Sequence, residues 1–303
     1  MTTSTDGGAS APSSFPSGRP GRKRRYTSVS PWWIALAVVF LVVFFVLPLI
    51  DNVQRSIDLS TLLLPGTQQN YYAKLFLDPY YLRVTMVTVV LSVGVTAICV
   101  LVGYPVALFL VRHSGRWGGL VIFLLIAPLL TSIIMRTFGW QVLFARRGLL
   151  NVTLMDFGWI DKPVNFLTGP TPVVVGLVHV LVPFMVLSIA SVLKSIDTQL
   201  EESARILGAG KIRTFFKVTF PLSLDGIGTG SILVFLLANG SFVTILLLGA
   251  GSMQTLPLLI YQQFNTTRDF GFAAAMSNVL LLVALVCLYL QLRLIRRRGT
   301  VGA

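Results

Sequence analysis

The sequence has few acidic residues, two histidines and two cysteines. Among 303 residues only 11 are Asp or Glu, and Cys99 and Cys287 both lie inside long apolar stretches. That placement fits buried thiols that pack as small hydrophobic side chains, and it argues against a disulfide framework or a cysteine metal site. His113 and His179 have no carboxylate in any apolar stretch to pair with. No catalytic and no metal-binding residue is therefore predicted.

Charged residues are also scarce. They make up 12% of the chain, whereas an ordinary soluble domain contains roughly a quarter. Hydrophobic residues make up 54%, and the mean hydropathy is +0.80. This composition excludes an ordinary soluble domain and predicts a protein embedded in a lipid bilayer.

Six apolar stretches are each long enough to cross a membrane, because about 20 helical residues span a hydrocarbon core of about 30 Å. They are Trp32–Ile50, Val84–Val111, Leu120–Phe144, Pro172–Leu193, Ile227–Leu248 and Phe272–Leu292. We therefore predict an all-α, polytopic fold in which residues 32–293 form a domain of six transmembrane helices. Residues 1–31 are predicted to be a disordered basic tail, and residues 294–303 a short basic C-terminus.

The distribution of Lys and Arg predicts the orientation. Of the 24 basic residues, 16 fall in the tail, the second and fourth loops and the C-terminus. Seven fall in the remaining loops, and Arg136 lies inside an apolar stretch. Cytoplasmic loops carry the excess of basic residues, so both termini are predicted to be cytoplasmic. The same rule accounts for the net charge of +13 without a nucleic-acid partner.

The fourth loop, residues 194–226, contains helix signals of its own. Thr198 and Glu201 have the spacing of a capping box, which predicts a helix that begins at Thr198. Gly208 is placed to end this helix in the left-handed conformation, and a second short helix then runs to Pro221, which stops it. One interpretation of this pattern is an amphipathic segment that lies on the lipid surface.

The order of residues within this loop also resembles the EAA motif of ABC-importer permeases, in which Glu-Ala-Ala is followed by Gly and later by Pro. The matching positions are Glu202, Ser203, Ala204, Arg205, Leu207, Gly208, Ala209 and Pro221, with Ser203 where the motif has Ala. The resemblance implies the type I importer permease fold and a loop that couples to a cytoplasmic ABC ATPase dimer. It also implies a second, related but non-identical permease chain and a periplasmic solute-binding protein.

Other stretches resemble the spermidine/putrescine subgroup of these permeases. They are Asp78–Arg83, Gly103–Pro105, Arg136–Trp140 and Gly148–Asn151. The subgroup has an acidic residue where this chain has Ser241. The resemblance implies a polyamine or a related small organic solute as the substrate, and the bacterial inner membrane as the location.

The sequence contains no motif for ATP hydrolysis. The nearest approach to a phosphate-binding loop, Gly208–Lys211, lacks the upstream Gly and the following Ser or Thr. We therefore expect no cofactor in this chain, and ATP and Mg on a partner ATPase. A secondary transporter with a surface amphipathic loop is the alternative function, although the absence of Asp and Glu from all six stretches argues against proton coupling.

Five residues are candidates for the substrate pathway. Arg136 is expected near the outer interface, where it either reaches the headgroups or meets the solute or its binding protein. Trp140, Phe242 and Tyr261 offer aromatic faces that attract ammonium groups, and Ser241 lies beside one of them.

Small residues at helical spacing predict one close helix contact. Gly226 and Gly230 form a G-x-x-x-G pattern at the start of the fifth apolar stretch, where two backbones can approach each other. His179, within the fourth stretch, is expected to form a hydrogen bond with a neighbouring helix.

Overall fold

A computed structural model of the chain describes residues 31–57, 70–113, 115–249 and 251–299, without the side chains of 31–34, 37 and 294–299. The predicted tail therefore lies outside the described residues except for Pro31. The chain divides into two compact units, residues 1–48 and residues 49–303. The first unit contains α1 (Pro31–Leu41) and the π turn η1 (Val42–Val46), and the second contains almost all the rest.

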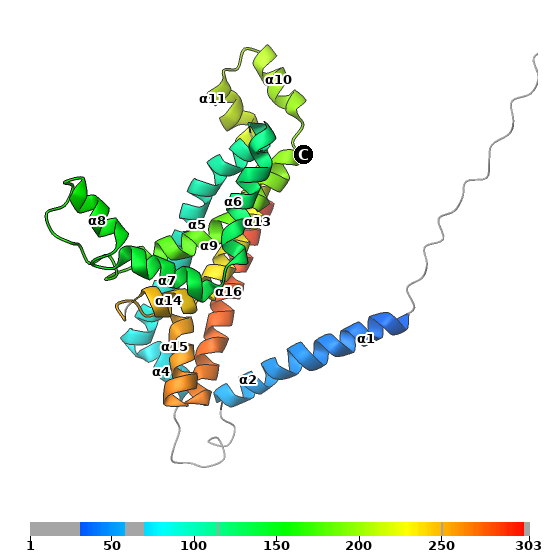
Figure 1. Ribbon diagram of the computed structural model, residues 1–303. Coiled ribbons are helices and arrows are strands. Elements are labelled where there is room, and N and C mark those ends of the chain that lie inside the picture. The colour runs from blue at the N-terminus through cyan, green and yellow to red at the C-terminus, as the bar shows by residue number, and fades with distance from the viewer. Residues whose placement is uncertain (1–30, 58–69, 114, 250, 300–303) are drawn as a thin grey trace, which may run out of the picture. The chain divides into compact units, whose positions relative to one another are not determined.

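Every regular element of the described residues is helical, which confirms the all-α prediction (Figure 1). The longer helices are α2 (Leu47–Ile57), α5 (Pro79–Arg112), α6 (Gly118–Leu130), α7 (Ile133–Phe144), α9 (Thr171–Ser195), α13 (Leu224–Asn239) and α16 (Phe270–Gly299). The shorter ones are α4 (Tyr71–Leu77), η2 (Gly115–Trp117), α8 (Leu149–Asp156), α10 (Thr198–Ile206), α11 (Lys211–Thr214), η3 (Phe215–Thr219), α12 (Phe220–Leu222), α14 (Val243–Leu248), α15 (Leu256–Gln262) and η4 (Gln263–Thr267).

Four continuous helical segments are long and apolar enough to cross a membrane. They are Val38–Ile57, Pro79–Arg112, Thr171–Ser195 and Phe270–Arg293. Two further pairs of helices pass the same test only together, each bent at a short break, and they bring the total to six.

The third predicted span is not one straight helix. The structure divides Leu120–Phe144 into α6 and α7, which are separated by Thr131 and Ser132. At this break the segments Gly115–Leu130 and Ile133–Asp156 are bent by 99°. Pro128 lies in the last turn of α6, and Thr131 takes an extended conformation that ends the helix. The apolar composition predicted the membrane depth of this segment, but it carried no information on the bend.

The fifth predicted span is also interrupted. Within Ile227–Leu248, α13 ends at Asn239 and α14 begins at Val243. The intervening residues close a turn in which the amide of Gly240 donates to the carbonyl of Leu236 and the amide of Ser241 donates to the carbonyl of Ala238. A six-residue helix therefore replaces the expected last turns of the span.

The core of the second unit lies where α5, α9 and α13 pack on one another. The predicted close contact at Gly226 and Gly230 is confirmed. A Cβ atom added to Gly226 would lie 3.1 Å from the Cα of Ile189, and one added to Gly230 would lie 2.7 Å from the Sδ of Met185. The hydroxyl of Ser188 donates to the carbonyl of Gly226 at 3.0 Å. The absence of side chains at these two positions thus lets the backbone of α13 meet α9 directly.

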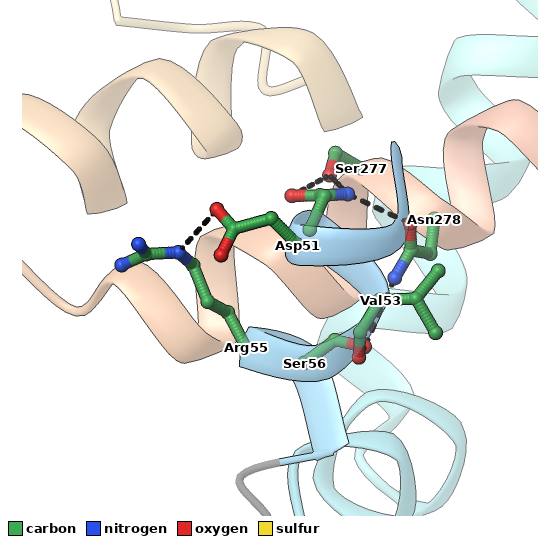
Figure 2. A network of polar contacts seen from close by, with 7 residues as sticks. Asp51, Val53, Arg55, Ser56, Ser277 and Asn278 are labelled. Carbon is green, nitrogen blue, oxygen red and sulfur yellow. Dashed lines mark hydrogen bonds and ion pairs between the residues drawn. The ribbon is translucent and has the colours of Figure 1, made fainter. Parts of the chain in front are cut away.

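A cluster of polar side chains joins α2 to α16 (Figure 2), and Tyr72 of α4 also belongs to it. The amide nitrogen of Asn52 donates to Asn278 at 2.7 Å and to Ser277 at 3.0 Å. The amide of Asn278 in turn donates to the hydroxyls of Ser56 and Tyr72. Hydrogen-bonded amides hold transmembrane helices together, each for about 0.6 to 2 kcal/mol. The cluster therefore fixes the end of the first candidate span against the last.

Candidate ATPase-coupling loop and substrate pathway

The first helix of the fourth loop, α10, begins as the sequence predicts but with a different cap. Asp197 is the N-cap residue, and its carboxylate accepts a hydrogen bond from the amide of Gln199 at 2.9 Å. Thr198 is already helical. The predicted capping box is therefore wrong, because the neighbouring aspartate takes the capping position and Glu201 points elsewhere.

Glu201 binds two residues far from it in the sequence. Its Oε1 atom accepts a hydrogen bond from Nη2 of Arg112, at the end of α5, at 2.8 Å, and another from the hydroxyl of Thr219 in η3 at 3.0 Å. In the described part of the chain, Glu201 forms no ion pair with Arg205, although a separation of four helical residues would allow one. A strong donor on α5 outcompetes an exposed partner four residues away, since a charge-assisted bond gains strength when it leaves water.

The end of α10 has the geometry that Gly208 predicts. Gly208 has a φ of 84°, in the left-handed region. Its amide donates to the carbonyl of Arg205, and the amide of Ala209 donates to the carbonyl of Ala204, both at 3.0 Å. These two bonds form a Schellman motif, which reverses the chain directly after the helix.

The second helical segment of the loop runs through α11, η3 and α12, and Pro221 does not stop it. Helical structure continues to Leu222, and the chain then bends by 57° at Ser223 into α13. The π turn η3 shifts the hydrogen-bond ladder by one residue just before Pro221, the residue that cannot donate to it. The proline is thus accommodated inside the segment.

The residues that resemble the EAA motif lie on an open surface. Glu202, Ser203, Arg205 and Gly208 are exposed. Several apolar side chains of the loop are uncovered as well, namely Leu200, Ile206, Leu207, Ile212 and Phe216, and Leu207 is 87% exposed. In Figure 1, α10 and α11 lie together at one end of the second unit, and α4 and α15 lie at the other. Such a patch of large apolar side chains is typical of a surface that another molecule covers.

The base of the loop is fixed to α5 by a second set of contacts. The hydroxyls of Tyr104 and Ser223 are 2.9 Å apart and hydrogen-bonded. The ring of Tyr104 packs against Phe215 and Phe220, with centroids 5.7 Å from each. The bend at Ser223 is therefore packed against α5, whereas much of the loop that precedes it is exposed.

The predicted pathway residues fall into two groups, and no hydrogen bond, ion pair or ring stacking joins the two groups in the described part of the chain. Phe242 and Tyr261 stack with ring centroids 5.0 Å apart, and Ser241 adjoins them in the break between α13 and α14. Trp140 lies on α7, where its indole nitrogen donates to Nδ1 of His179 on α9 at 3.4 Å. This contact confirms the expected helix-to-helix hydrogen bond of His179.

Arg136 has a local partner. Its guanidinium donates to the carbonyl of Thr131 at 2.8 Å and to the hydroxyl of the same residue at 3.3 Å. Thr131 is the C-cap of α6, so the positive charge meets the negative end of a helix dipole at the bend between α6 and α7.

Comparison with known proteins decides the family. The model of the binding-protein-dependent transport system inner membrane component matches residues 63–300, most of the chain. The chain belongs to this family. The permease is 35% identical over 254 residues to the spermidine/putrescine transport system permease protein PotB of Escherichia coli (strain K12), covering 82% of this chain and 92% of that protein. It is 32% identical to PotB of Haemophilus influenzae over 278 residues, covering 88% of this chain and 95% of that protein.

Solved structures show the fold. The permease matches a chain of a bacterial ABC transporter involved in the import of the acidic polysaccharide alginate, with a TM-score of 0.73 at 20% identity, covering 88% of this chain and 94% of that chain. A second match is to a bacterial alginate ABC transporter in complex with an alginate pentasaccharide-bound periplasmic protein, with a TM-score of 0.71 at 19% identity, covering 88% of this chain and 93% of the other. The expected importer permease fold is therefore confirmed.

Local sequence patterns do not identify two residues that organise the fourth loop of the permease. Arg112 is one of the basic residues of the second loop, and no local pattern assigns a role to Thr219. Their meeting at Glu201 depends on the packing of α5 against the loop, which no local pattern encodes.

Proposed function

We propose that this chain is a membrane-spanning subunit of an ATP-driven importer for spermidine, putrescine or a close relative of these amines. The observation that carries the proposal is the 35% identity to PotB over 92% of that protein, together with the family match. ATP and Mg bind a separate ABC ATPase dimer, because this chain has no phosphate-binding loop. A second permease chain and a periplasmic solute-binding protein complete the importer.

The coupling surface is the exposed part of α10 and the turn after it. Glu202, Ser203 and Arg205 supply polar contacts to the ATPase, while Ala204, Leu207, Gly208 and Ala209 permit close approach. The large exposed apolar side chains of the loop support this proposal, because contact between apolar side chains and water costs free energy that a bound partner would recover. Pro221 is exposed as well and lies two residues before Ser223, where the loop bends into α13.

The topology has residues 32–293 as the six-span domain, with both termini in the cytoplasm. Residues 1–31 form a basic tail and residues 294–303 a basic C-terminus on that side. In Figure 1, α16 runs back toward the end at which α10 and α11 lie, which supports a common side for the fourth loop and the C-terminus. Of the Lys and Arg residues outside the apolar stretches, 16 lie on this side and seven on the other.

The substrate pathway follows the two helix breaks. Backbone groups that leave a helix at membrane depth need a protein or aqueous partner, so such breaks occur where they line a cavity or are buried in protein. The break after α13 presents Ser241, Phe242 and, from α15, Tyr261. The break before α7 presents Arg136, with Trp140 one turn further on. The stacked pair supplies the aromatic faces that an amine needs in the absence of a carboxylate.

The importer assignment is tested by purifying the tagged permease in mild detergent and identifying its partners by mass spectrometry. An ABC ATPase and a second permease are expected to co-purify. Deletion of this chain is expected to abolish uptake of radiolabelled spermidine or putrescine by the host. Recovery of the chain alone, with unchanged amine uptake in the deletion strain, would refute the proposal.

Replacing Phe242 by Ala is expected to lower amine uptake about 2- to 30-fold at subsaturating substrate, because the loss of one cation–π contact of about 0.5–2 kcal/mol weakens the binding of the amine. The matched control is Phe264→Ala. This variant removes a ring from another aromatic pair, Phe264 in η4 and Phe270 at the start of α16, whose centroids are 5.1 Å apart. ATPase co-purification should be normal in both variants. Equal uptake by the two variants would show that Phe242 does not contact the substrate.

A further inference from the structure

The first helix of the coupling loop, α10, is joined by an ion pair to a helix that is not its neighbour in the chain. Covalently, α10 joins α9 at one end and α11 at the other. The ion pair between Glu201 and Arg112, 2.8 Å long, connects it to α5, through a residue 89 positions away in the sequence. The loop thus has a non-covalent connection to a third membrane helix.

This ion pair is shielded from water. The side chains of Arg112 and Glu201 are 16% and 13% exposed. The other ion pair of the described residues, between Asp51 and Arg55, has side chains 58% and 60% exposed, respectively (Figure 2). An exposed pair contributes little, whereas a shielded pair is costly to break because either partner is left as an uncompensated charge.

The same pair holds both segments of the loop. Glu201 accepts a hydrogen bond from the hydroxyl of Thr219, so its carboxylate connects α10, η3 and α5 at one point. Beside it lies a cavity of about 460 Å³, bounded by Arg112, Glu202, Arg205, Lys211 and Thr214 among others. The two segments therefore do not pack tightly on α5 there, and the ion pair spans the gap between them and α5.

The helix at the far side of the pair lies at the centre of the membrane domain. α5 packs along both α9 and α13, and these three helices supply most of the core. Through the covalent chain alone, a movement of α10 would be passed on to α9 and α13, the two helices that the loop connects. With the ion pair in place, the same movement would also be passed on to α5, so that all three helices would move as a group.

We infer that Arg112 and Glu201 form a bracket that transmits the movement of the ATPase-contacting helix α10 to α5. The inference rests on the proposed function, since it needs an ATPase at α10. Arg112 and Glu201 are positioning residues: they touch neither ATP nor the solute. Glu202, the adjacent acid, is exposed and remains available to the ATPase, so the two neighbouring glutamates have different tasks.

The experiment compares transport with ATP hydrolysis in proteoliposomes that contain the complete importer and its binding protein. The variants are Arg112→Gln, Glu201→Gln and the double exchange Arg112→Glu with Glu201→Arg. Each single variant is expected to keep the ATPase bound and to hydrolyse ATP, while amine transported per ATP falls at least about 10-fold, since each leaves one charge without its partner. The double exchange should recover at least half of the lost transport.

Two further variants sharpen the test. Thr219→Val removes one hydrogen bond from Glu201 but keeps the ion pair, so its transport per ATP should fall less than in either single charge variant. Arg55→Gln breaks the exposed ion pair and should change nothing. Co-purification of the ATPase is measured for every variant, and failure of wild type to retain an ATPase would refute the proposed function rather than the bracket.

Three results would overturn the bracket. The first is wild-type transport per ATP in both single variants. The second is loss of the ATPase in proportion to the loss of transport, which would assign the pair to docking alone. The third is a double exchange that folds, retains the ATPase and transports no better than the single variants, because a charge bracket depends on the attraction between its partners.

Discussion

Gly208→Glu is expected to release the ATPase from the permease and to abolish amine uptake. Gly208 has a φ of 84°, a conformation that costs an L-residue with a Cβ about 1–2 kcal/mol. A Cβ added at this position would meet no other atom of the chain within 4 Å, so the variant protein should still fold. The substitution would strain the Schellman turn. It would also add a charged side chain to the surface around Leu207, between α10 and the ATPase.

The matched control for this prediction is Gly208→Asn. Asparagine enters the left-handed region more readily than other residues with a Cβ, so the turn is preserved while a polar side chain is still added. We expect Gly208→Asn to keep most of the bound ATPase and a measurable fraction of uptake. Both are measured by pull-down and by radiolabelled uptake in the same membranes. Normal uptake by Gly208→Glu would exclude this turn from the coupling surface.

Gly226→Val is expected to prevent stable folding of the membrane domain. The added Cβ would lie 3.0 Å from the Cβ of Val192 and 3.1 Å from the Cα of Ile189, and a backbone atom cannot move aside without displacing α9. Overpacking of this kind costs about 1–3 kcal/mol or more. It would also separate the hydroxyl of Ser188 from the carbonyl of Gly226.

The measurement is the yield and the thermal stability of the permease in detergent, followed by size-exclusion chromatography. Gly226→Val should give at least about a 10-fold lower yield of monodisperse protein, as expected for the loss of a well-packed helix contact. Gly94→Val is the control, because Gly94 lies within α5 and a Cβ there meets nothing within 4 Å. If both variants gave the wild-type yield, the contact between α13 and α9 would not limit folding.

Several features of the permease follow from local sequence alone. The membrane location follows from composition and from the length of the apolar stretches, and the left-handed end of α10 follows from Gly208. The close approach of α13 to α9 follows from Gly226 and Gly230. Each depends on residues that are neighbours in the chain or one helical turn apart, so the pattern is present in the sequence itself.

Other features were predicted wrongly or were not predicted, because more than one partner or conformation was available to the same residues. Thr198 and Glu201 fit a capping box, yet Asp197 supplies the cap and Glu201 binds Arg112. Pro221 has the ordinary signal of a helix end, yet a π turn accommodates it. A local pattern shows which nearby residues could pair with a side chain, but only the packed structure shows whether a stronger partner from another helix lies within reach.

The sequence by itself determined that this chain is an all-helical membrane protein with an ordered fourth loop and a family signature in that loop. Tertiary structure decided where the helices break, which stacked rings lie at those breaks, and which charge holds the loop to α5. The physical reason is that the hydrophobicity and length of a segment, which are properties of the local sequence, determine whether the segment lies in the membrane. The ion pair of Arg112 with Glu201, by contrast, joins residues 89 positions apart, so it depends on a partner that only the folded chain supplies.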